Sequence, residues 1–153
     1  GVVFYVEEGG KSGMIMSMDQ AYLKWSTENI YCNCNNPKDG SFNMQSIKYH
    51  DPTLEKHPAA KWCADHGEGW YLPASYELNL MWDAVSDGKH VFDYEFVKLY
   101  NDKLDDPIRE DYYWSSNETT ENMAEVVVFI DNSVICLEPY KTSPFYVRAI
   151  HKF

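Results

Sequence analysis

The first third of the chain alternates short apolar runs with turn residues. Residues 2–6 are β-branched and aromatic, a glycine-rich stretch follows at 7–13, and apolar residues resume at 14–18. Glycines supply the positive φ that a tight hairpin turn needs, so this pattern predicts an N-terminal β-hairpin. Residues 28–43 then gather Asn, Asp, Pro and Gly, a composition typical of a long loop.

Helical periodicity occurs three times in the middle of the chain. Apolar side chains recur at i, i+3, i+4 and i+7 over residues 59–66, where Pro58 suits the first turn and Gly67 the end. The same spacing recurs over 78–85 and more weakly over 92–104. We expect two to three helices in this part of the chain.

The last third changes to β-rich runs, at 112–116, 123–130, 134–138 and 145–153. Turn residues separate the last three of these runs, which predicts a C-terminal antiparallel meander. The stretch 126–130 is apolar at every position, so we expect it to be central and covered on both faces. Together the elements predict an α+β fold in a single domain spanning residues 1–153.

The net charge excludes several classes of partner. The 24 Asp and Glu residues outnumber the 13 Lys and Arg residues, which leaves a net charge of −11 at pH 7. Nucleic-acid binders need cationic patches that displace counterions from phosphates, so we expect no nucleic-acid partner. The sequence has no apolar run near the roughly 20 residues that cross a bilayer, so we expect no membrane insertion of this domain. Neutral glycans and proteins stay open as ligands.

Known catalytic and metal-binding patterns find little support. Cys32, Cys34, Cys63 and Cys136 could nominally form a four-thiolate zinc site, but a second C-x2-4-C pair is missing. Core thiols or a disulfide fit these cysteines better, and the first two could hold the loop at 28–43. The chain also lacks an H-E-x-x-H helix, a calcium loop and a G-x-S-x-G turn. We therefore expect no enzyme activity, no metal and no cofactor.

The most distinctive segment is Gly-Trp-Tyr-Leu-Pro-Ala-Ser-Tyr-Glu-Leu, at residues 69–78. Pro73 fixes φ just before a helix, and Glu77 falls near the third helical position, where its carboxylate can reach back to the free amides of the first turn. Trp70 and Leu72 would anchor the entering strand in the core. This is a structural device and by itself indicates no activity.

Arg148 stands apart because the chain has only two arginines and this one lies in an otherwise apolar closing strand. A charged side chain in such a position is rarely buried unless it is paired. We predict that Arg148 is partly buried and paired, with Glu77 as a candidate partner.

The segment 69–78 resembles the Trp-Arg-Leu-Pro-Thr-x-x-Glu-Leu signature of a large bacterial family related to the C-terminal domain of collagen-like adhesins. That family is grouped with C-type-lectin-like folds. Residues 1–6 resemble its first strand, residues 113–116, which include Trp114, its Tyr-Trp-Ser-Ser strand, and residues 146–150 its closing Val-Arg strand. The matches cover nearly the whole chain in the family's order, and the resemblance implies a C-type-lectin-like fold.

Several positions depart from this family. Ala74 replaces the usual capping Thr, which should cost about 1 kcal/mol unless Ser75 caps the helix instead. Ala149 stands where many members carry Cys, so we expect Cys63 to be a buried thiol. Residues 138–140 are Glu-Pro-Tyr, without the carboxamide after Pro that calcium-dependent sugar sites of C-type lectins use.

The resemblance implies a non-catalytic ligand-binding or adhesion module in an exported protein of a Gram-negative anaerobe, extracellular, at the cell surface or in the periplasm. The chain would be the C-terminal part of a longer protein. One alternative is a structural accessory domain without a ligand. Another is an oxidase of the formylglycine-generating type, but such enzymes use two late cysteines and only Cys136 follows Cys63.

Loops on a rigid scaffold are the usual place for recognition, and long loops are expected at 28–57 and 101–122. Amides, carboxylates and exposed rings suit contacts with a glycan or a protein ligand. The candidate ligand-binding residues are Tyr112, Asn117, Glu118, Asn122 and Tyr140. Ordinary solvation of these loops is the alternative interpretation.

Overall fold

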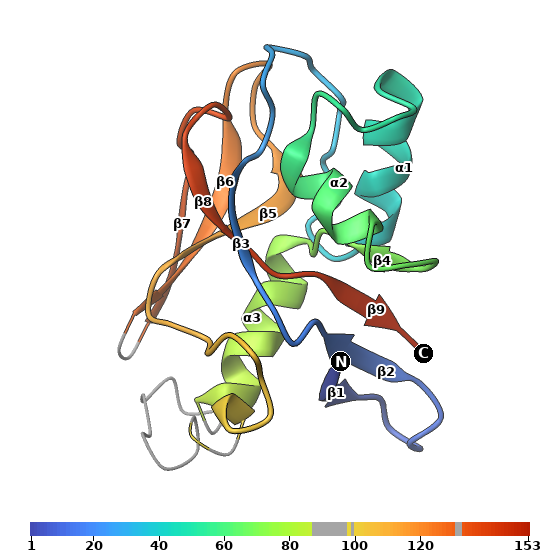
Figure 1. Cartoon of the computed structure of the whole chain (residues 1–153), viewed down its shortest axis with the longest axis vertical. Helices are drawn as coiled ribbons and strands as arrows, with labels where there is room; N and C mark the ends of the chain where they lie inside the picture. Colours follow the sequence, from blue (N-terminus) through green and yellow to red (C-terminus); the bar gives the residue numbers. More distant parts are fainter. Residues whose placement is uncertain (87–97, 99, 131–132) are drawn as a thin grey trace.

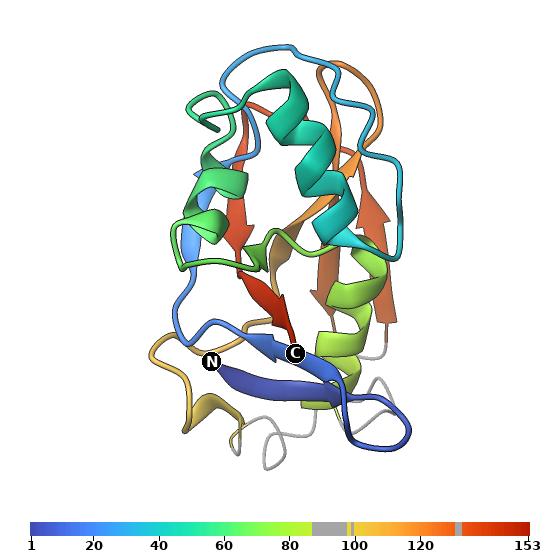
Figure 2. The ribbon, with the colours of Figure 1, turned by 90° about the vertical axis from the view of Figure 1, so that its right-hand side faces the viewer.

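The computed structural model describes residues 1–86, 98, 100–130 and 133–153. Within these residues three helices pack with two β-sheets, which confirms the predicted α+β class (Figures 1 and 2). The elements in chain order are β1 (Val2–Val6), β2 (Gly13–Met16), β3 (Ala21–Lys24), α1 (Gly40–His50), α2 (Pro58–Ala64), β4 (Trp70–Tyr71), α3 (Ser75–Val85), β5 (Tyr112–Glu118), β6 (Ala124–Ile130), β7 (Ser133–Leu137), β8 (Pro144–Val147) and β9 (Ile150–Lys152). The helix expected over 92–104 lies largely outside the described residues.

The smaller sheet brings the two ends of the chain together. Its strand order is β1-β2-β9-β4, with every pair antiparallel. The predicted N-terminal hairpin is β1–β2, and its turn contains Gly9 and Gly10 at φ values of 98° and 71°. Because β2 pairs directly with β9, the N- and C-termini lie near each other in Figures 1 and 2.

The larger sheet has the order β3-β8-β5-β6-β7. Strands β5, β6 and β7 form the expected antiparallel meander, but β8 runs parallel to β5. The run 145–153 was expected to be one strand. It is instead divided between β8 and β9, which belong to different sheets, because the chain leaves the larger sheet at Arg148 and Ala149. The last strand therefore connects the two sheets rather than ending the meander.

Helices α2 and α3 begin close to where the apolar spacing predicts them, whereas α1 was expected to be loop. Asp39 is the N-cap of α1, and its Oδ1 accepts hydrogen bonds from the backbone N–H groups of Ser41 at 3.0 Å and Phe42 at 3.4 Å. Asp, Asn and Gly favour turns and helix caps alike. A composition that we interpreted as loop therefore contained the start of a helix.

The corner before α3 is built as the sequence predicts, around a buried Glu77. Glu77 Oε2 accepts from the backbone N–H of Ala74 at 2.8 Å, which is the expected reach back to the first turn. The same oxygen accepts from Gly40 N–H at 2.9 Å, and Oε1 accepts from the Tyr71 hydroxyl at 2.9 Å. Lys152 Nζ lies 3.2 Å from Oε1. One carboxylate thus joins β4, β9 and the starts of α1 and α3.

Two further free amides of α3 are satisfied from elsewhere in the fold. Ser75 N–H donates to Asn117 Oδ1 at 2.9 Å, and Tyr76 N–H donates to the Pro37 carbonyl at 3.0 Å. Ser75 does not cap the helix, since its hydroxyl donates to the Pro37 carbonyl at 3.4 Å. Distant groups therefore replace the side-chain cap that Ala74 cannot provide.

Arg148 is fully buried, but the prediction that it pairs with Glu77 is wrong. Its guanidinium donates to the carbonyl oxygens of Ser17 at 2.8 Å and Asp106 at 2.7 Å, and to Gln20 Oε1 at 2.9 Å. Backbone and amide oxygens, rather than a carboxylate, accept hydrogen bonds from Nη1 and Nη2, whereas Nε has no acceptor among the described residues. It holds the segment that follows β2 and the segment that precedes β5 against the junction of β8 and β9.

The core lies between the helices and the larger sheet. Trp82 of α3 stacks on Phe129 of β6 with ring centroids 4.7 Å apart, and Trp114 is buried with its Nε1 donating to the Leu23 carbonyl at 2.9 Å. Cys63 is a buried free thiol, as expected. No helix among the described residues is long and apolar enough to cross a membrane.

Candidate functional site

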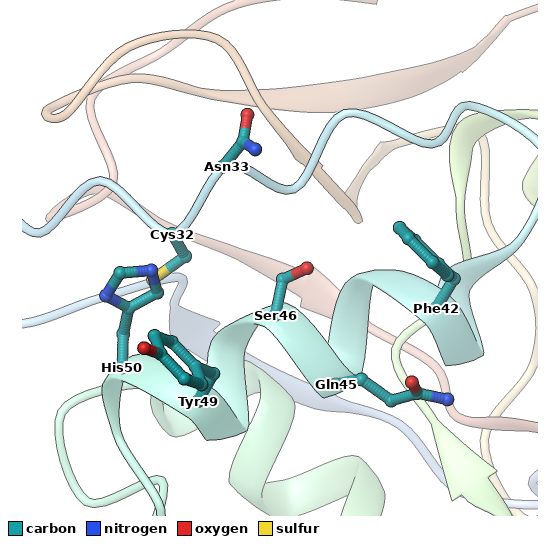
Figure 3. A pocket seen from close by; sticks show the side chains of 7 residues that line it. All are labelled: Cys32, Asn33, Phe42, Gln45, Ser46, Tyr49 and His50. Carbon is teal, nitrogen blue, oxygen red and sulfur yellow. The ribbon is translucent and has the colours of Figure 1, made fainter.

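A hollow of about 320 Å³ lies between α1 and the segment before it; we call it the α1 groove. Figure 3 shows Phe42 and Tyr49 near opposite ends of the helix, with Ser46 between them. Cys32 and Asn33 stand on the facing segment. The lining residues are Cys32, Asn33, Phe42, Gln45, Ser46, Tyr49 and His50.

The groove follows from the amphipathic spacing of α1. Met44 and Ile47 of this helix are buried in the core. The lining residues at 42, 45, 46, 49 and 50 follow the i, i+3, i+4, i+7, i+8 spacing of the opposite face. Phe42 is 50 % exposed and Tyr49 is 83 % exposed. Two large rings therefore reach solvent on the face that lines the groove.

Polar side chains hold the facing segment in place. The backbone N–H of Asn36 donates to Asn43 Oδ1 at 3.0 Å, while Asn43 Nδ2 donates to the Asn36 carbonyl at 2.8 Å. Asn117 Nδ2 donates to the same carbonyl at 2.9 Å. Asn33 adopts a left-handed φ of 57°, which asparagine tolerates better than most residues. The wall of the groove is thus fixed by amide hydrogen bonds to α1 and β5.

A buried ion pair also holds the segment that faces α1 across the groove. The Lys141 ammonium donates to the Glu118 carboxylate, and both side chains are fully buried. Lys141 also donates to the carbonyls of Ile30 and Glu121, each at 2.8 Å, and lies 4.7 Å from the Trp25 ring centroid. Glu118 Oε2 accepts from the backbone N–H of Cys32 at 2.8 Å. The pair therefore connects the groove wall to β5 and to the turn after it.

A histidine and a carboxylate stand behind Cys32. Cys32 Sγ lies 3.5 Å from His57 Nε2, and His57 Nδ1 lies 2.8 Å from Asp51 Oδ2. Burial lowers the pKa of His57, but its hydrogen bonds to Cys32 and Asp51 outweigh burial and leave that pKa raised. Burial acts to raise the pKa of Asp51, but hydrogen bonds from His57 and from the Lys56 backbone leave it lowered. The arrangement favours a charged imidazolium beside the sulfur.

The five predicted ligand-binding residues do not form one site. Asn117 and Glu118 are buried, and their polar atoms are engaged with the chain itself. Asn122 is half-buried, and its Oδ1 accepts a hydrogen bond from the Thr120 hydroxyl at 2.8 Å. Tyr112 and Tyr140 are exposed at 39 % and 57 %. A direct ligand contact by any of these residues stays a prediction, and two of them position the groove wall.

Tyr112 lines a second hollow of about 280 Å³, the sheet hollow, on the face of the larger sheet that carries Trp114. The residues lining it are Tyr112, Val126, Leu137, Glu138, Pro139 and Phe145. Apolar side chains dominate this lining, whereas rings, amides and hydroxyls line the α1 groove. In the part of the chain that the structure describes, no group of three or more His, Cys, Asp or Glu residues is arranged to hold a metal ion.

Sequence reasoning missed the α1 groove because α1 itself was expected to be loop. One signal was present: Asp39 followed by Gly-Ser-Phe, then Met44 and Ile47 at helical spacing. The Lys141–Glu118 pair had no local signal, since the two residues are 23 positions apart, Glu118 in β5 and Lys141 in the turn before β8.

Comparison with solved structures shows where this fold occurs. The chain resembles the crystal structure of a fimbrial protein from Bacteroides ovatus with a TM-score of 0.71 and 19% sequence identity. The match covers 92% of this chain and 36% of the fimbrial protein, so this chain spans about a third of that protein's length. No protein-family model matches the sequence, and no curated protein matches it. At this identity the likeness establishes a shared fold.

Proposed function

We propose that this chain is a non-catalytic ligand-binding module of adhesion type that binds its ligand in the α1 groove. The observation that carries the proposal is the pair of exposed rings, Phe42 and Tyr49, that flank a hollow on one face of α1. Exposed large rings beside convergent polar groups are typical of binding sites. The buried supports on both sides of the groove keep its shape without a ligand, which reduces the entropy lost on binding.

The proposed ligand is a neutral glycan. The residues lining the groove include Asn33, Gln45 and Ser46 but no Asp, Glu, Lys or Arg. Amides donate and accept hydrogen bonds, which suits sugar hydroxyls, and aromatic rings can cover the apolar face of a sugar ring. The net charge of −11 disfavours anionic ligands. A protein ligand is the alternative outcome of the test below.

We further propose a C-type-lectin-like framework, as the sequence resemblance implies. Support comes from the paired terminal strands β2 and β9 and from the Leu-Pro corner that Glu77 organises. Glycan binding would then not use the calcium motif, because residues 138–140 are Glu-Pro-Tyr.

An exported, cell-surface or periplasmic location follows as part of the same proposal. It is supported by the fold shared with part of a fimbrial protein. The chain would act as one domain, the C-terminal part, of a longer surface protein.

The experiment is a glycan array followed by affinity measurement on three variants. Tyr49→Ala and Phe42→Ala should each weaken binding by at least about tenfold, since truncating an aromatic anchor of a binding site costs about 2 kcal/mol or more and tenfold corresponds to about 1.4 kcal/mol. Tyr140→Ala is the matched control, because its ring is 57 % exposed outside the groove. All variants should keep the wild-type unfolding midpoint. Loss of binding only in Tyr140→Ala would move the site to the loops, and binding to proteins but not glycans would change the ligand class.

A specific observation favours a second candidate, a structural accessory domain with no ligand of its own. Ile130, Ile135 and Leu137 are 36 %, 43 % and 46 % exposed on β6 and β7. Neighbouring exposed apolar side chains often mark a packing surface. An absence of binding in broad glycan and protein screens, with Tyr49→Ala behaving like the wild type throughout, would favour this function.

A further inference from the structure

Two cysteines separated by one residue meet beneath the α1 groove with opposite electrostatic surroundings. Cys32 lines the groove and is 1 % exposed, and Cys34 is fully buried. Interaction with the Cys34 thiol, opposed by burial and aided by His57, lowers the pKa of Cys32 to about 5. The same interaction and burial raise the pKa of Cys34 far above its usual range, and the Cys34 sulfur also lies 3.5 Å from the Asn43 carbonyl oxygen, to which its thiol can donate. One sulfur is thus favoured as thiolate and the other as thiol.

Other charged or titratable groups lie near this pair, and His50 lines the same groove as Cys32. Glu118 lies close enough to oppose the negative charge on both sulfurs, and Lys141, its ion-pair partner, favours charge on Cys34. His57 contacts Cys32 from the start of α2, and Asp51 orients the imidazole from the end of α1. Nucleophile, proton-transfer group and orienting carboxylate therefore occur in the order that activated cysteines use.

We propose that Cys32 and Cys34 form a redox-active pair that undergoes exchange with disulfide compounds entering through the α1 groove. Cys32 is the attacking sulfur and Cys34 the resolving one. A reactive cysteine is distinguished from an inert one by an electropositive neighbour and a path to solvent. Cys32 has the His57 imidazole 3.5 Å from its sulfur and lines the groove, although only 1 % of the residue is exposed. This proposal goes beyond ligand binding and does not rest on it.

The exchange balances without a further reagent. The Cys32 thiolate attacks one sulfur of a disulfide RSSR′, which forms the Cys32–SR bond and releases R′S⁻, and His57 donates the proton that makes R′SH. Cys34 then transfers its proton to His57, attacks Cys32 Sγ and expels RS⁻, which His57 protonates. The chain loses two electrons and two protons as Cys32–Cys34 forms, and the disulfide is reduced to RSH and R′SH.

The backbone between the cysteines allows the bridge. A disulfide needs Cα atoms no more than about 7 Å apart. Asn33 lies between them with a φ of 57°. The Cα atoms of two residues that flank a single residue are at most about 7 Å apart even in extended backbone. Both thiols are free in the described structure, which is the reduced member of the proposed couple.

The first test uses oxidised glutathione and peptide mass spectrometry. Trypsin cleaves after Lys24 and Lys38, so one peptide contains Cys32 and Cys34 and no other cysteine. We expect this peptide to lose two hydrogens in the Cys136→Ser chain. Cys34→Ser should instead retain one glutathionyl group on Cys32, and Cys32→Ser should show neither change. An unmodified peptide in both the parent chain and Cys34→Ser would overturn the proposal.

The second test compares two thiols in the same molecule. Cys136 is exposed and its pKa is raised, mainly by burial of its sulfur and then by Glu125. Between about pH 8 and about pH 6 its alkylation rate should fall roughly 100-fold, while that of Cys32 changes less than about threefold. His57→Gln should slow Cys32 at about pH 6 by roughly tenfold without changing Cys136. Parallel pH profiles for the two thiols would overturn the proposal.

Discussion

Two buried carboxylates, Glu77 and Glu118, hold opposite walls of the α1 groove. Glu77 accepts from Gly40 N–H at the first residue of α1, and Glu118 accepts from Cys32 N–H on the facing segment. Each also pairs with a lysine. The Lys152 side chain beside Glu77 is 44 % exposed, whereas the Lys141 side chain beside Glu118 is completely buried.

The two carboxylates differ in how far along the chain their hydrogen-bond partners lie, and this decides which of them can be predicted from the sequence. Glu77 bonds to Ala74 three residues before it, a spacing that belongs to the helix start itself. Glu118 reaches Cys32 across 86 residues. Glu77 is buried but its partner Lys152 reaches solvent, whereas Glu118 and Lys141 are both buried and stabilise each other's charge. We therefore expect the two sites to respond differently to the same kind of substitution.

The largest effect should come from removing one member of the buried pair. Lys141→Ala leaves Glu118 charged and without its partner, which should lower the free energy of unfolding by about 3–5 kcal/mol. Urea denaturation measures this. The double variant Lys141→Met/Glu118→Leu removes both charges and should cost clearly less than the single variant. A single-variant cost below about 1 kcal/mol would contradict the described pairing.

Glu77→Gln should have an intermediate effect. The amide keeps one acceptor oxygen but turns its NH₂ group toward donors, either Ala74 and Gly40 or Tyr71 and Lys152. Hydrogen bonds to charged groups contribute about 1.5–3 kcal/mol, so a loss of that order is expected in urea denaturation. The matched control is Glu68→Gln, at an exposed position, which should change stability little. Equal losses in both variants would contradict the role of Glu77.

The pH dependence of Asp51→Asn tests the carboxylate behind Cys32. Because the pKa of Asp51 is lowered on folding, its contribution is present above the unfolded pKa of about 3.9 and is lost as pH falls through the folded value. The substitution should cost about 1–2 kcal/mol near neutral pH and progressively less in acid. Urea denaturation at a series of pH values measures this. Asp65→Asn is the control, because its pair with Lys61 is exposed and should matter little at any pH. A cost that did not change with pH would rule out the proposed linkage.

The smallest effect is expected at Ala74. A serine at an N-cap normally stabilises a helix by about 1 kcal/mol relative to alanine. Here the Tyr76 amide already has an acceptor and position 74 is fully buried, where a new hydroxyl loses its hydration, so Ala74→Ser should shift the free energy of unfolding by less than about 0.5 kcal/mol. Thermal or urea denaturation decides the matter, and a full capping gain would show that this amide is not satisfied.

The sequence predicted those parts of the fold that depend on residues close together along the chain. The β1–β2 turn, helices α2 and α3, and the reach of Glu77 follow from spacing over a few residues. The burial of Arg148 also followed from its apolar strand, but its partners did not, because they are carbonyls set by tertiary packing.

The candidate site depends almost wholly on contacts between distant segments. Asn117 and Glu118 were selected as ligand contacts because their side chains are polar and lie in an expected loop, yet they belong to β5 and hold the groove wall. Lys141 lies in a sequence typical of an exposed turn, and the sequence gives no sign that it is fully buried. A single sequence does not indicate which polar residues fold inward, since their partners lie far along the chain.

The most direct test of the central claim is amide chemical-shift mapping by NMR during titration with a glycan that the array identifies. If the α1 groove is the binding site, the largest shifts should occur at Asn33, Gln45, Ser46 and Tyr49, with little change along β6 and β7. Shifts concentrated instead around Tyr112, Leu137 and Tyr140, with α1 unchanged, would contradict the account.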